Sequence, residues 1–403
     1  MNIQNINIQD YNYNLPEEKI AKYPLKNREN SKLLIYDKGN ISHKTFKNIY
    51  DLISNNELLV FNNTKVIQAR LNFKKETGAN IEVFCLEPVE PADYSLMFQS
   101  TNSCKWKCIV GNLKKWKKGN ISFEYTDNKN ITKIFASKIS SNEDSHIIEF
   151  TWDNKDLTFA EILEKSGEIP IPPYLKRKSE ESDLRRYQTV YSKYKGSVAA
   201  PTAGLHFTNE ILLNFKKTGI KTANITLHVG AGTFKPVKTN SVSEHEMHTE
   251  QFSVTKEFLE KLINNLGNIT AVGTTTVRTL ESLYFLGLKL SQKPKDNDFH
   301  IKQWEVYDFK KDLSSKEALQ CIIEFMNNEK IDKFDASTQI IIVPGYKFNI
   351  VNKLITNFHQ PKSTLLLLIS AFIGEDWKKI YKYSLENKFR FLSYGDSSIL
   401  MPK

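Results

Sequence analysis

Hydrophobic and polar positions alternate at strand spacing, or recur at helical spacing, in segments that end in loops of small residues. The clearest segment is 222–229, where every second position is apolar, and the strand that this predicts runs directly into the loop 230–233. Just before it, Thr208 is placed to cap a helix through Lys217, and Gly219 is placed to end that helix. Helix, strand and loop therefore follow one another as in an α/β domain.

A loop of small residues also precedes that helix. Residues 196–206 read GSVAAPTAGLH and contain no Lys, Arg, Asp or Glu. Small side chains let backbone N–H groups approach a ligand closely, as binding of a phosphate, carboxylate or ribose requires. Such loops are also typical of tight turns without a ligand, and the loop 230–233 lacks the third glycine of a dinucleotide-binding fingerprint. The pattern favours a nucleoside-type ligand and leaves the purely structural interpretation open.

The strand-to-loop pattern recurs in residues 268–287. Residues 268–272 predict a strand that ends at Gly273, and three threonines, 274–276, then begin a helix that carries Arg278. A run of threonines is also explained by strand propensity and helix capping alone. Because ligands bind open α/β sheets at the carboxyl ends of their strands, we expect this loop to lie near the loop 230–233.

A last pattern of this kind lies near the C-terminus. Residues 338–343 read as a buried strand, and the polar residues 356–364 come immediately before an apolar helix over 365–372. Polar side chains at a helix N-terminus suit an anion such as a carboxylate or an RNA phosphate.

Residues 64–153 have a different character, because helical periodicity of useful length is absent. Short alternating segments are separated by Gly, Asn and Asp; they are 81–86, 106–110, 121–125 and 147–150. This is typical of a small antiparallel barrel or sandwich. Helix and strand alternation resumes afterwards, so we expect an α/β domain of residues 1–61 and 154–403 with residues 62–153 inserted in it. The basic patch 114–118 suits an RNA backbone, although such a patch is more often a solvated hairpin tip.

Composition adds a weak indication of a polyanionic partner. The 403 residues include 56 Lys and Arg against 46 Asp and Glu, a formal net charge of +10, and Lys and Arg neutralise phosphates. Few of the basic residues are arginines, and a planar guanidinium is a distinctive choice where bidentate or stacked contacts are needed. We expect this of Arg278 and of one of Arg185 and Arg186, whereas others, Arg177 first among them, are open to being incidental. The arginines are Arg28, Arg70, Arg177, Arg185, Arg186, Arg278 and Arg390.

The sequence predicts neither a metal site nor a membrane role. The 4 cysteines form neither a disulfide framework nor a paired zinc motif, so we expect reduced thiols in a cytoplasmic protein. The HxxH of residues 245–248 lacks the spacing of a zinc-binding HExxH helix and has no nearby Cys. The N-terminus is polar without a signal-peptide core, and the longest apolar run, 365–373, is too short to span a bilayer.

Longer motifs carry a resemblance to a known family. In chain order they are LPEEKIAKYPL, GSVAAPTAGLHFT, TLHVGAGTF, AVGTTTVRTLES, PGYKF, TNFHQPKSTLLLLISAF and FRFLSYGDSSIL. Together they resemble the S-adenosylmethionine:tRNA ribosyltransferase-isomerase family of queuosine biosynthesis over nearly the whole chain. The resemblance implies that the inserted domain is an antiparallel β-barrel.

The resemblance also implies an enzyme and its reaction. Members of the family move the ribosyl part of S-adenosylmethionine, a cosubstrate, onto 7-aminomethyl-7-deazaguanine at the wobble position of tRNA. The products are epoxyqueuosine-tRNA, adenine and methionine. The sulfonium acidifies the C5′ protons, so the enzyme needs a base, a donor for the departing adenine and a site for the methionyl carboxylate. We expect a monomer.

Site residues are assigned by chemical type. The candidates for acid–base catalysis are His206 and His228, followed by His248 and His359. The candidates for binding the cosubstrate are Thr202, Ala203, Gly204, Gly230, Gly232, Thr233, Thr274, Thr275, Arg278, Lys362 and Ser363. The candidates for binding RNA are Arg185, Arg186 and Tyr187, which a helix over 183–191 would present.

The chain departs from the family pattern at a few positions. Asn63 stands where an acidic residue is common, Val343 and Gln360 replace commoner apolar choices, and MHTEQFSV lacks the aromatic residue usual after its glutamate. None of these changes removes a group assigned to chemistry. The change at Asn63 would matter if the acid normally paired with an arginine.

Two other classes of protein remain open from the residues alone. A methyltransferase would use the same cosubstrate, although no acidic glycine-rich loop follows the first strand, and it would release S-adenosylhomocysteine. A noncatalytic RNA-binding protein would bind RNA without consuming a cosubstrate, and it would not need the neutral small-residue loops.

Overall fold

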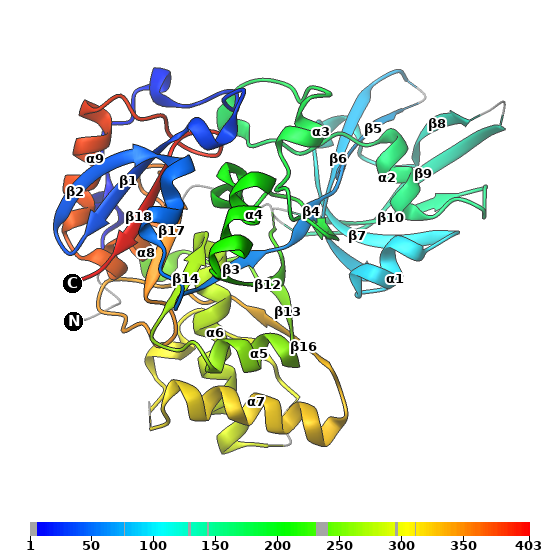
Figure 1. The fold of residues 1–403 in the computed structure, drawn as a ribbon. Helices are drawn as coiled ribbons and strands as arrows, with labels where there is room; N and C mark the ends of the chain where they lie inside the picture. Colours follow the sequence, from blue (N-terminus) through cyan, green and yellow to red (C-terminus); the bar gives the residue numbers. More distant parts are fainter. Residues whose placement is uncertain are drawn as a thin grey trace.

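The computed structural model describes residues 6–75, 77–127, 130–142, 145–230, 241–294, 297–310 and 312–403. They form an α/β body, built from both ends of the chain, and a β-barrel that projects from one side of it (Figure 1). The predicted fold class is therefore confirmed.

The body is organised around a 10-stranded mixed sheet, in the order β15-β16-β13-β12-β3-β14-β17-β18-β1-β2. Its strands are β1 (Lys32–Asp37), β2 (Asn40–Thr45), β3 (Leu58–Asn62), β12 (Lys221–His228), β13 (Glu250–Thr255), β14 (Ile269–Val272), β15 (His300–Ile301), β16 (Lys333–Thr338), β17 (Lys353–Asn357) and β18 (Ser397–Met401). The central strands β12, β3, β14 and β17 are parallel neighbours. Their carboxyl ends, and the loops that follow them, therefore lie at one edge of the sheet.

Helices cover both faces of this central sheet. Leu58 and Val60 of β3 belong to a core shared with α6 (Thr274–Gln292), whereas Leu59 and Phe61 belong to a core shared with α4 (Asn209–Thr218). Successive strand side chains point to opposite faces, so a continuous apolar run is what a doubly covered strand requires.

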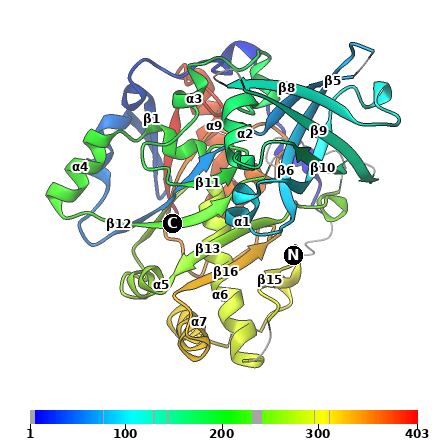
Figure 2. The same ribbon diagram turned by 90° about the vertical axis from the view of Figure 1, so that its right-hand side faces the viewer.

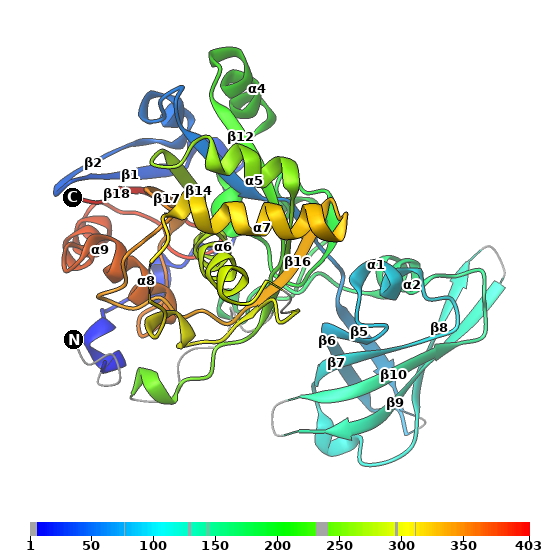
Figure 3. The ribbon, with the colours of Figure 1, turned by 90° about the horizontal axis from the view of Figure 1, so that it is seen from below.

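Four further helices of the body contribute to the core that contains α6. They are α5 (Lys256–Ile263), α7 (Ser315–Glu329), α8 (Thr364–Ile373) and α9 (Asp376–Glu386). Figure 3 shows α5, α6 and α7 stacked along one face of the sheet. The longest apolar run of the sequence forms α8, which is packed into this core, and no helix in the described ranges is long and apolar enough to cross a membrane.

The inserted segment forms a closed antiparallel barrel in the order β10-β7-β6-β5-β8-β9. Its strands are β5 (Arg70–Lys74), β6 (Asn80–Glu90), β7 (Ser103–Val110), β8 (Ile121–Asp127), β9 (Asn130–Ser141) and β10 (His146–Trp152), and α1 (Tyr94–Gln99) lies between β6 and β7. The helix α2 (Phe159–Ser166) adds Phe159 and Leu163 to the barrel core. The expected domain boundaries at 62 and 153 stay a prediction.

The basic patch 114–118 lies just after β7, at a 3-10 turn. Trp116 has an exposed fraction of 0%, and its Nε1 donates to the carbonyl oxygen of Gly119 at 2.8 Å. Its ring is therefore not available to stack on a base, which favours the solvated tip over an RNA grip.

A short parallel pair joins the barrel to the body: β4 (Thr64–Val66) and β11 (Tyr194–Ser197). At its start the side chain of Asn62 acts as a backbone substitute. Its Oδ1 accepts from the N–H groups of Thr64 and Leu227, and its Nδ2 donates 3.0 Å to the carbonyl of Leu227. This buried amide lets β3 turn into β4 while β12 continues beyond it.

Two sequence predictions were wrong in their extent. The helix expected over 183–191 is limited to α3 (Asp183–Arg186). The chain then leaves the helix because the amide of Gln188 bonds both the N–H and the carbonyl of Val66, at 2.9 and 2.8 Å.

The strand expected over 338–343 is also wrong, because β16 ends at Thr338. Residues 340–343 are buried but bond elsewhere: Arg278 donates to the carbonyl of Ile340, and the Tyr307 hydroxyl donates to the carbonyl of Ile341 and accepts from Val343 N–H. These side-chain bonds, together with backbone bonds from Gln339 to Ile301 and from Ile341 to Gln303, replace regular strand pairing here.

The PGYKF turn is fixed by one buried carboxylate of α6. Glu281 accepts from the Tyr346 hydroxyl at 2.8 Å and from the N–H groups of Asn349, Ile350 and Val351 at 2.9, 3.0 and 3.0 Å. This acceptor set joins α6 to the segment that leads into β17.

We predict that Glu281→Gln lowers the free energy of unfolding by about 3 kcal/mol, because the amide places a donor against N–H groups that need an acceptor. Chemical denaturation monitored by circular dichroism measures this loss. The matched control is Glu329→Gln at the exposed end of α7. Equal stability of the two variants would contradict the prediction.

Candidate functional site

Several of the predicted loops meet around one cavity of about 100 Å³, which we call the loop cavity. Of the sequence candidates, Thr202, Ala203, Thr274, Thr275, His359, Ser363 and Tyr187 line it. Gly273 follows β14 and residues 358–360 follow β17, so the cavity lies at the carboxyl edge of the central sheet. Most of the loop 230–233, which the carboxyl-edge argument expects beside Gly273, lies outside the described residues, so that part of the expectation stays a prediction.

The N-terminus of α6 opens onto this cavity. Gly273, at φ 97°, is the N-cap residue and has no side chain to bond the first turn. The hydroxyl of Thr276 donates back to Val272 and that of Thr279 donates to Thr275, so neither fills the helix end. A 19-residue helix therefore presents its N–H groups and the positive end of its dipole beside Thr274 and Thr275.

His359 is the candidate acid–base residue that lines the loop cavity. Its Nε2 lies 3.1 Å from the Thr356 hydroxyl, while Nδ1 has no hydrogen-bond partner in the described part of the chain. The side chain is partly exposed to the cavity but lies deep in the protein, and burial lowers its pKa to about 3. The imidazole is therefore neutral and has a nitrogen available for a ligand.

His206 lies behind the wall of the cavity. Its Nδ1 is 2.8 Å from the Ser31 hydroxyl and its Nε2 is 3.0 Å from Oδ1 of Asn357, which lines the cavity. The Asn357 amide nitrogen donates to the carbonyls of Leu392 and Ser393, so its oxygen must accept from Nε2–H of His206. Both ring nitrogens are thus occupied, and burial lowers the pKa of His206 to about 4.

Tyr187 was expected to contact RNA from a helix surface, but it has an exposed fraction of 0% and lines the loop cavity. Its Oη is buried without a hydrogen-bond partner in the described ranges, and burial raises the pKa of Tyr187 well above its usual range. The phenol is therefore protonated, with the Ala200 backbone and the Ser393 hydroxyl beside it, and any RNA that it contacts must enter the cavity.

Sequence reasoning missed part of the cavity wall. Tyr174 and Ser393 both line it, and their hydroxyls bond each other. Leu392 is also a wall residue, with a left-handed φ of 69°. The available signals were the motif FRFLSYGDSSIL and the Tyr that ends the proline run, because a proline run fixes the direction of the chain.

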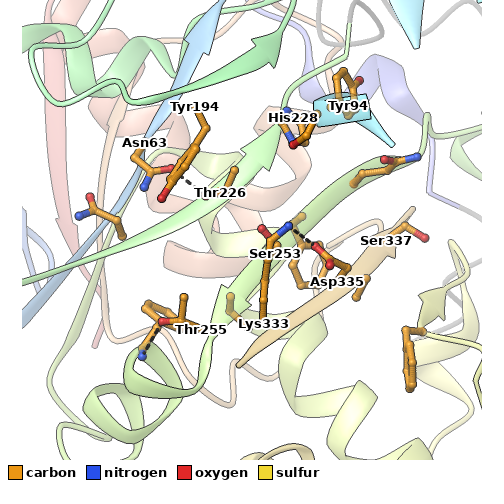
Figure 4. Close-up of a pocket in the computed structure, with 18 of the residues that line it drawn as sticks. Asn63, Tyr94, Tyr194, Thr226, His228, Ser253, Thr255, Lys333, Asp335 and Ser337 are labelled. Carbon is orange, nitrogen blue, oxygen red and sulfur yellow. Dashed lines mark hydrogen bonds and ion pairs between the residues drawn. The ribbon is translucent and has the colours of Figure 1, made fainter. Parts of the chain in front are cut away.

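A larger space of about 1010 Å³, the interdomain cleft, lies between the barrel and the antiparallel strands β12, β13 and β16. Figure 2 shows α1 of the barrel above these strands. Its polar lining includes Ser253, Thr255 and Ser337 on neighbouring strands (Figure 4). Val229 lines the loop cavity and His228 lines the cleft, so the two spaces lie on opposite sides of the end of β12.

His228 joins the barrel to the body. Its ring stacks on Tyr94 of α1 with centroids 4.0 Å apart and an angle of 16° (Figure 4). Burial, with a further contribution from the charge of Lys333, lowers the pKa of His228 to about 4.

Near His228, Oδ1 of Asn63 accepts from the Thr226 hydroxyl at 2.9 Å (Figure 4). Asn63 stands where an acidic residue is common in the family, and its amide oxygen still acts as an acceptor here.

Arg278 and His248 share a buried carboxylate away from both spaces. Glu250, with an exposed fraction of 0%, accepts from Nη1 of Arg278 at 2.5 Å and lies 3.3 Å from Nε2 of His248. The pKa of Glu250 is lowered even though burial, the largest influence on it, acts to raise it; the charge of Arg278 and the contact with His248 outweigh burial. Within the described ranges no group of three or more His, Cys, Asp and Glu is arranged to hold a metal ion.

The remaining candidates lie elsewhere. A Cβ on Gly204 would meet the Tyr191 hydroxyl at 1.9 Å, so that glycine allows close packing. Lys362 donates its N–H to Tyr11, Gly230 lies beside His248, and Arg185 is exposed on α3. Gly232 and Thr233 lie outside the described residues. The roles assigned to all of these residues stay predictions.

Comparisons with known proteins agree with the motif resemblance. The family model described as "Queuosine biosynthesis protein" matches residues 8–400. The chain is 38% identical to the S-adenosylmethionine:tRNA ribosyltransferase-isomerase of Sulfurihydrogenibium sp. (strain YO3AOP1), over 98% of this chain and 99% of the relative. It is 37% identical to the protein of the same name from Thermoanaerobacter sp. (strain X514), over 97% and 99%. A crystal structure of S-adenosylmethionine tRNA ribosyltransferase from Thermotoga maritima is 27% identical with a TM-score of 0.46, covering 97% of this chain and 100% of that one.

We predict that Gly196→Ala destabilises the junction between barrel and body. Gly196 has φ 139°, and a Cβ there would lie 2.4 Å from Nδ1 of His228 and 2.9 Å from Cδ1 of Tyr94. The free energy of unfolding should fall by about 2–4 kcal/mol, compared with about 1 kcal/mol for Gly219→Ala. Gly219 also has a positive φ but meets no described atom within 4 Å. Equal melting temperatures of the two variants would refute the clash.

The buried His206 predicts a pH dependence of stability. Its pKa is about 4 in the folded protein and near 6.5 ordinarily, so between these values the unfolded chain binds a proton that the folded chain does not. Stability therefore falls as the pH drops from 6.5 towards 4, by up to about 1.4 kcal/mol per pH unit for this group. The free energy of unfolding, measured by chemical denaturation at pH 7, 6 and 5, should fall less steeply with decreasing pH in His206→Gln than in His43→Gln. The control variant alters an exposed imidazole. An unchanged slope in His206→Gln would exclude this group as its source.

Proposed function

The chain belongs to the queuosine biosynthesis protein family, and from this membership we propose that it is an S-adenosylmethionine:tRNA ribosyltransferase-isomerase. It transfers the ribosyl part of S-adenosylmethionine to 7-aminomethyl-7-deazaguanine at the wobble position of tRNA. The products are epoxyqueuosine-tRNA, adenine and methionine. We further propose that it acts as a monomer in the cytoplasm.

One observation of the structure supports this function above the others. Loops from distant parts of the chain bring uncharged small residues and an open helix N-terminus to one cavity. Such a cavity suits a ligand that carries its own charges, as a methionyl carboxylate and a sulfonium do. An RNA-binding module without catalysis would not need it.

We place the methionyl carboxylate at the N-terminus of α6. The N–H groups near Thr274 and Thr275 supply donors there, and the helix dipole favours an anion. The loop cavity, at about 100 Å³, is smaller than the ~300–1,000 Å³ typical of ligand pockets, so it holds one part of the cosubstrate. The rest must extend past the cavity wall, or the wall must move when the ligand binds.

We assign proton removal from C5′ to His359. It is the sequence candidate with a ring nitrogen free in the loop cavity. A pKa of about 3 makes its imidazole a weak base, so the assignment requires the bound carboxylate to raise that pKa towards the working pH. We assign donation to the departing adenine to the Tyr187 hydroxyl, a protonated group in the same wall.

His206 has a positioning role in this proposal. Because both of its ring nitrogens are occupied, it acts through Asn357, whose amide it orients in the cavity wall. His228 and His248 remain the alternative candidates for acid–base catalysis if His359 does not supply it.

The function is tested by incubating the protein with S-adenosylmethionine and tRNA that carries the aminomethyl base, followed by chromatography. Adenine and methionine should appear in equal amounts and only with the modified tRNA. S-adenosylhomocysteine would instead identify a methyltransferase. RNA binding without either product would leave a noncatalytic binding protein.

We predict that His359→Asn lowers kcat by ~10²–10⁴-fold, the usual contribution of a general base, with a smaller change in KM for S-adenosylmethionine. The control is His43→Asn, which alters an exposed imidazole on β2. The pH–rate profile of the native enzyme should lose its acidic limb in His359→Asn. A kcat within a few-fold of the native value would transfer the role to another group.

A further inference from the structure

Four of the arginines gather where the N-terminal segment 22–28 crosses the body. Nε of Arg177 donates to the carbonyl of Lys22 at 3.0 Å, and Nη2 of Arg390 donates to that of Tyr23 at 2.9 Å. Arg186 donates to the carbonyls of Leu25 and Lys26. In Figure 1 this dark blue segment lies beside the red C-terminal part of the chain.

Three of these guanidinium groups form no ion pair in the described ranges; Arg390 bonds only carbonyls but feels the charge of Asp396, whereas Arg28 and Arg186 lack any such carboxylate. Arg177 forms a bidentate pair with Asp183, at 2.7 and 2.8 Å. Arg28, by contrast, donates 3.0 Å to the carbonyl of Gln188, and Arg186 bonds only carbonyls. Within the described ranges neither Arg28 nor Arg186 has a carboxylate within ion-pair distance.

The two groups are close enough to repel each other. Burial, followed by the charge of Arg186, lowers the pKa of Arg28. Both side chains are half-buried. Like charges that are partly removed from water raise the free energy unless an anion joins them.

Arg28 and Arg186 line a shallow depression of about 20 Å³, together with Ser31, His206 and Ser393. This volume is close to that of one water-sized group, so it accommodates a single phosphoryl oxygen of a larger ligand. Ser393 also lines the loop cavity, and His206 with Asn357 stands between the two spaces. An anion in the depression would therefore lie just outside the wall of the loop cavity.

We propose that Arg28 and Arg186 bind a backbone phosphate of the RNA substrate, next to the nucleotide whose base enters the loop cavity. This rests on the proposed function. A base that undergoes chemistry leaves the stack and enters a pocket, so the phosphate beside it must lie near the pocket mouth. Planar guanidinium forks suit phosphate, which explains two arginines here in a chain that mostly uses lysine.

The competing explanation is that these arginines only clamp the N-terminal segment. Both explanations predict some loss of stability on substitution, so stability alone does not separate them. Salt dependence does, because a phosphate contact releases counterions from RNA and a clamp does not.

The test measures the affinity of the full chain for the anticodon stem-loop bearing the aminomethyl base, over a series of KCl concentrations. Arg28→Gln should weaken binding by roughly 10-fold and reduce the slope of log affinity against log salt by about 1. Arg28→Lys keeps the charge, so it should retain the slope with intermediate affinity. Arg70→Gln removes the same charge from the barrel, where Arg70 pairs with Glu82, and should match the native protein.

Circular dichroism melting confirms that each variant is folded at the assay temperature. Folded Arg28→Gln and Arg186→Gln with native affinity and slope would overturn the proposal and leave a clamp. Competition with inorganic phosphate separates the two sources of the anion. If inorganic phosphate displaces the stem-loop only at millimolar concentration, the anion bound by these arginines is a phosphate of the RNA. If inorganic phosphate binds tightly and Arg28→Gln leaves the affinity for the stem-loop unchanged, the proposal is overturned. Native protein that binds RNA with this salt behaviour but releases no adenine would refute the proposed reaction and keep the phosphate site.

Discussion

The structure depends on how the central parallel strands end. β3, β14 and β17 are buried on both faces and β12 on one, so the polar backbone groups at the ends of these strands must find partners. At the end of β3 the chain has to leave for the barrel while β12 continues. The buried amide of Asn62 makes this possible, because it bonds β4 and both backbone groups of Leu227 in place of a strand neighbour.

That divergence creates two spaces with different chemistry on either side of β12. The loop cavity is enclosed by small residues and an open helix end, and it presents neutral groups to a ligand. The interdomain cleft is ten times larger and lined by polar side chains of an exposed sheet face (Figure 4). His228 lines the cleft and the adjacent Val229 lines the loop cavity. Because His228 stacks on Tyr94 of the barrel, a movement of the barrel would shift the cavity wall at Val229.

Buried charge is handled in two ways in this chain. Asp183, Glu250 and Glu281 each accept from a donor far away in sequence, namely Tyr394, Arg278 and Tyr346, so these carboxylates join distant segments. The histidines that line or back the two spaces are instead kept neutral by burial. Arg28 and Arg186 fit neither pattern, and this exception is the reason to look for an anion beside them.

The sequence by itself determined the alternation of strands and helices, the inserted all-β segment and the family, because local periodicity and long motifs carry that information. It also indicated the loops at Thr202, Thr274 and His359, from a run of small residues, from threonines after a strand and from polar residues before an apolar helix. It could not show that His206 is hydrogen-bonded to Asn357, that Arg278 forms an ion pair with Glu250, or that Tyr187 is buried. Those facts depend on contacts between segments more than 25 residues apart, and only tertiary packing decides which way such side chains point.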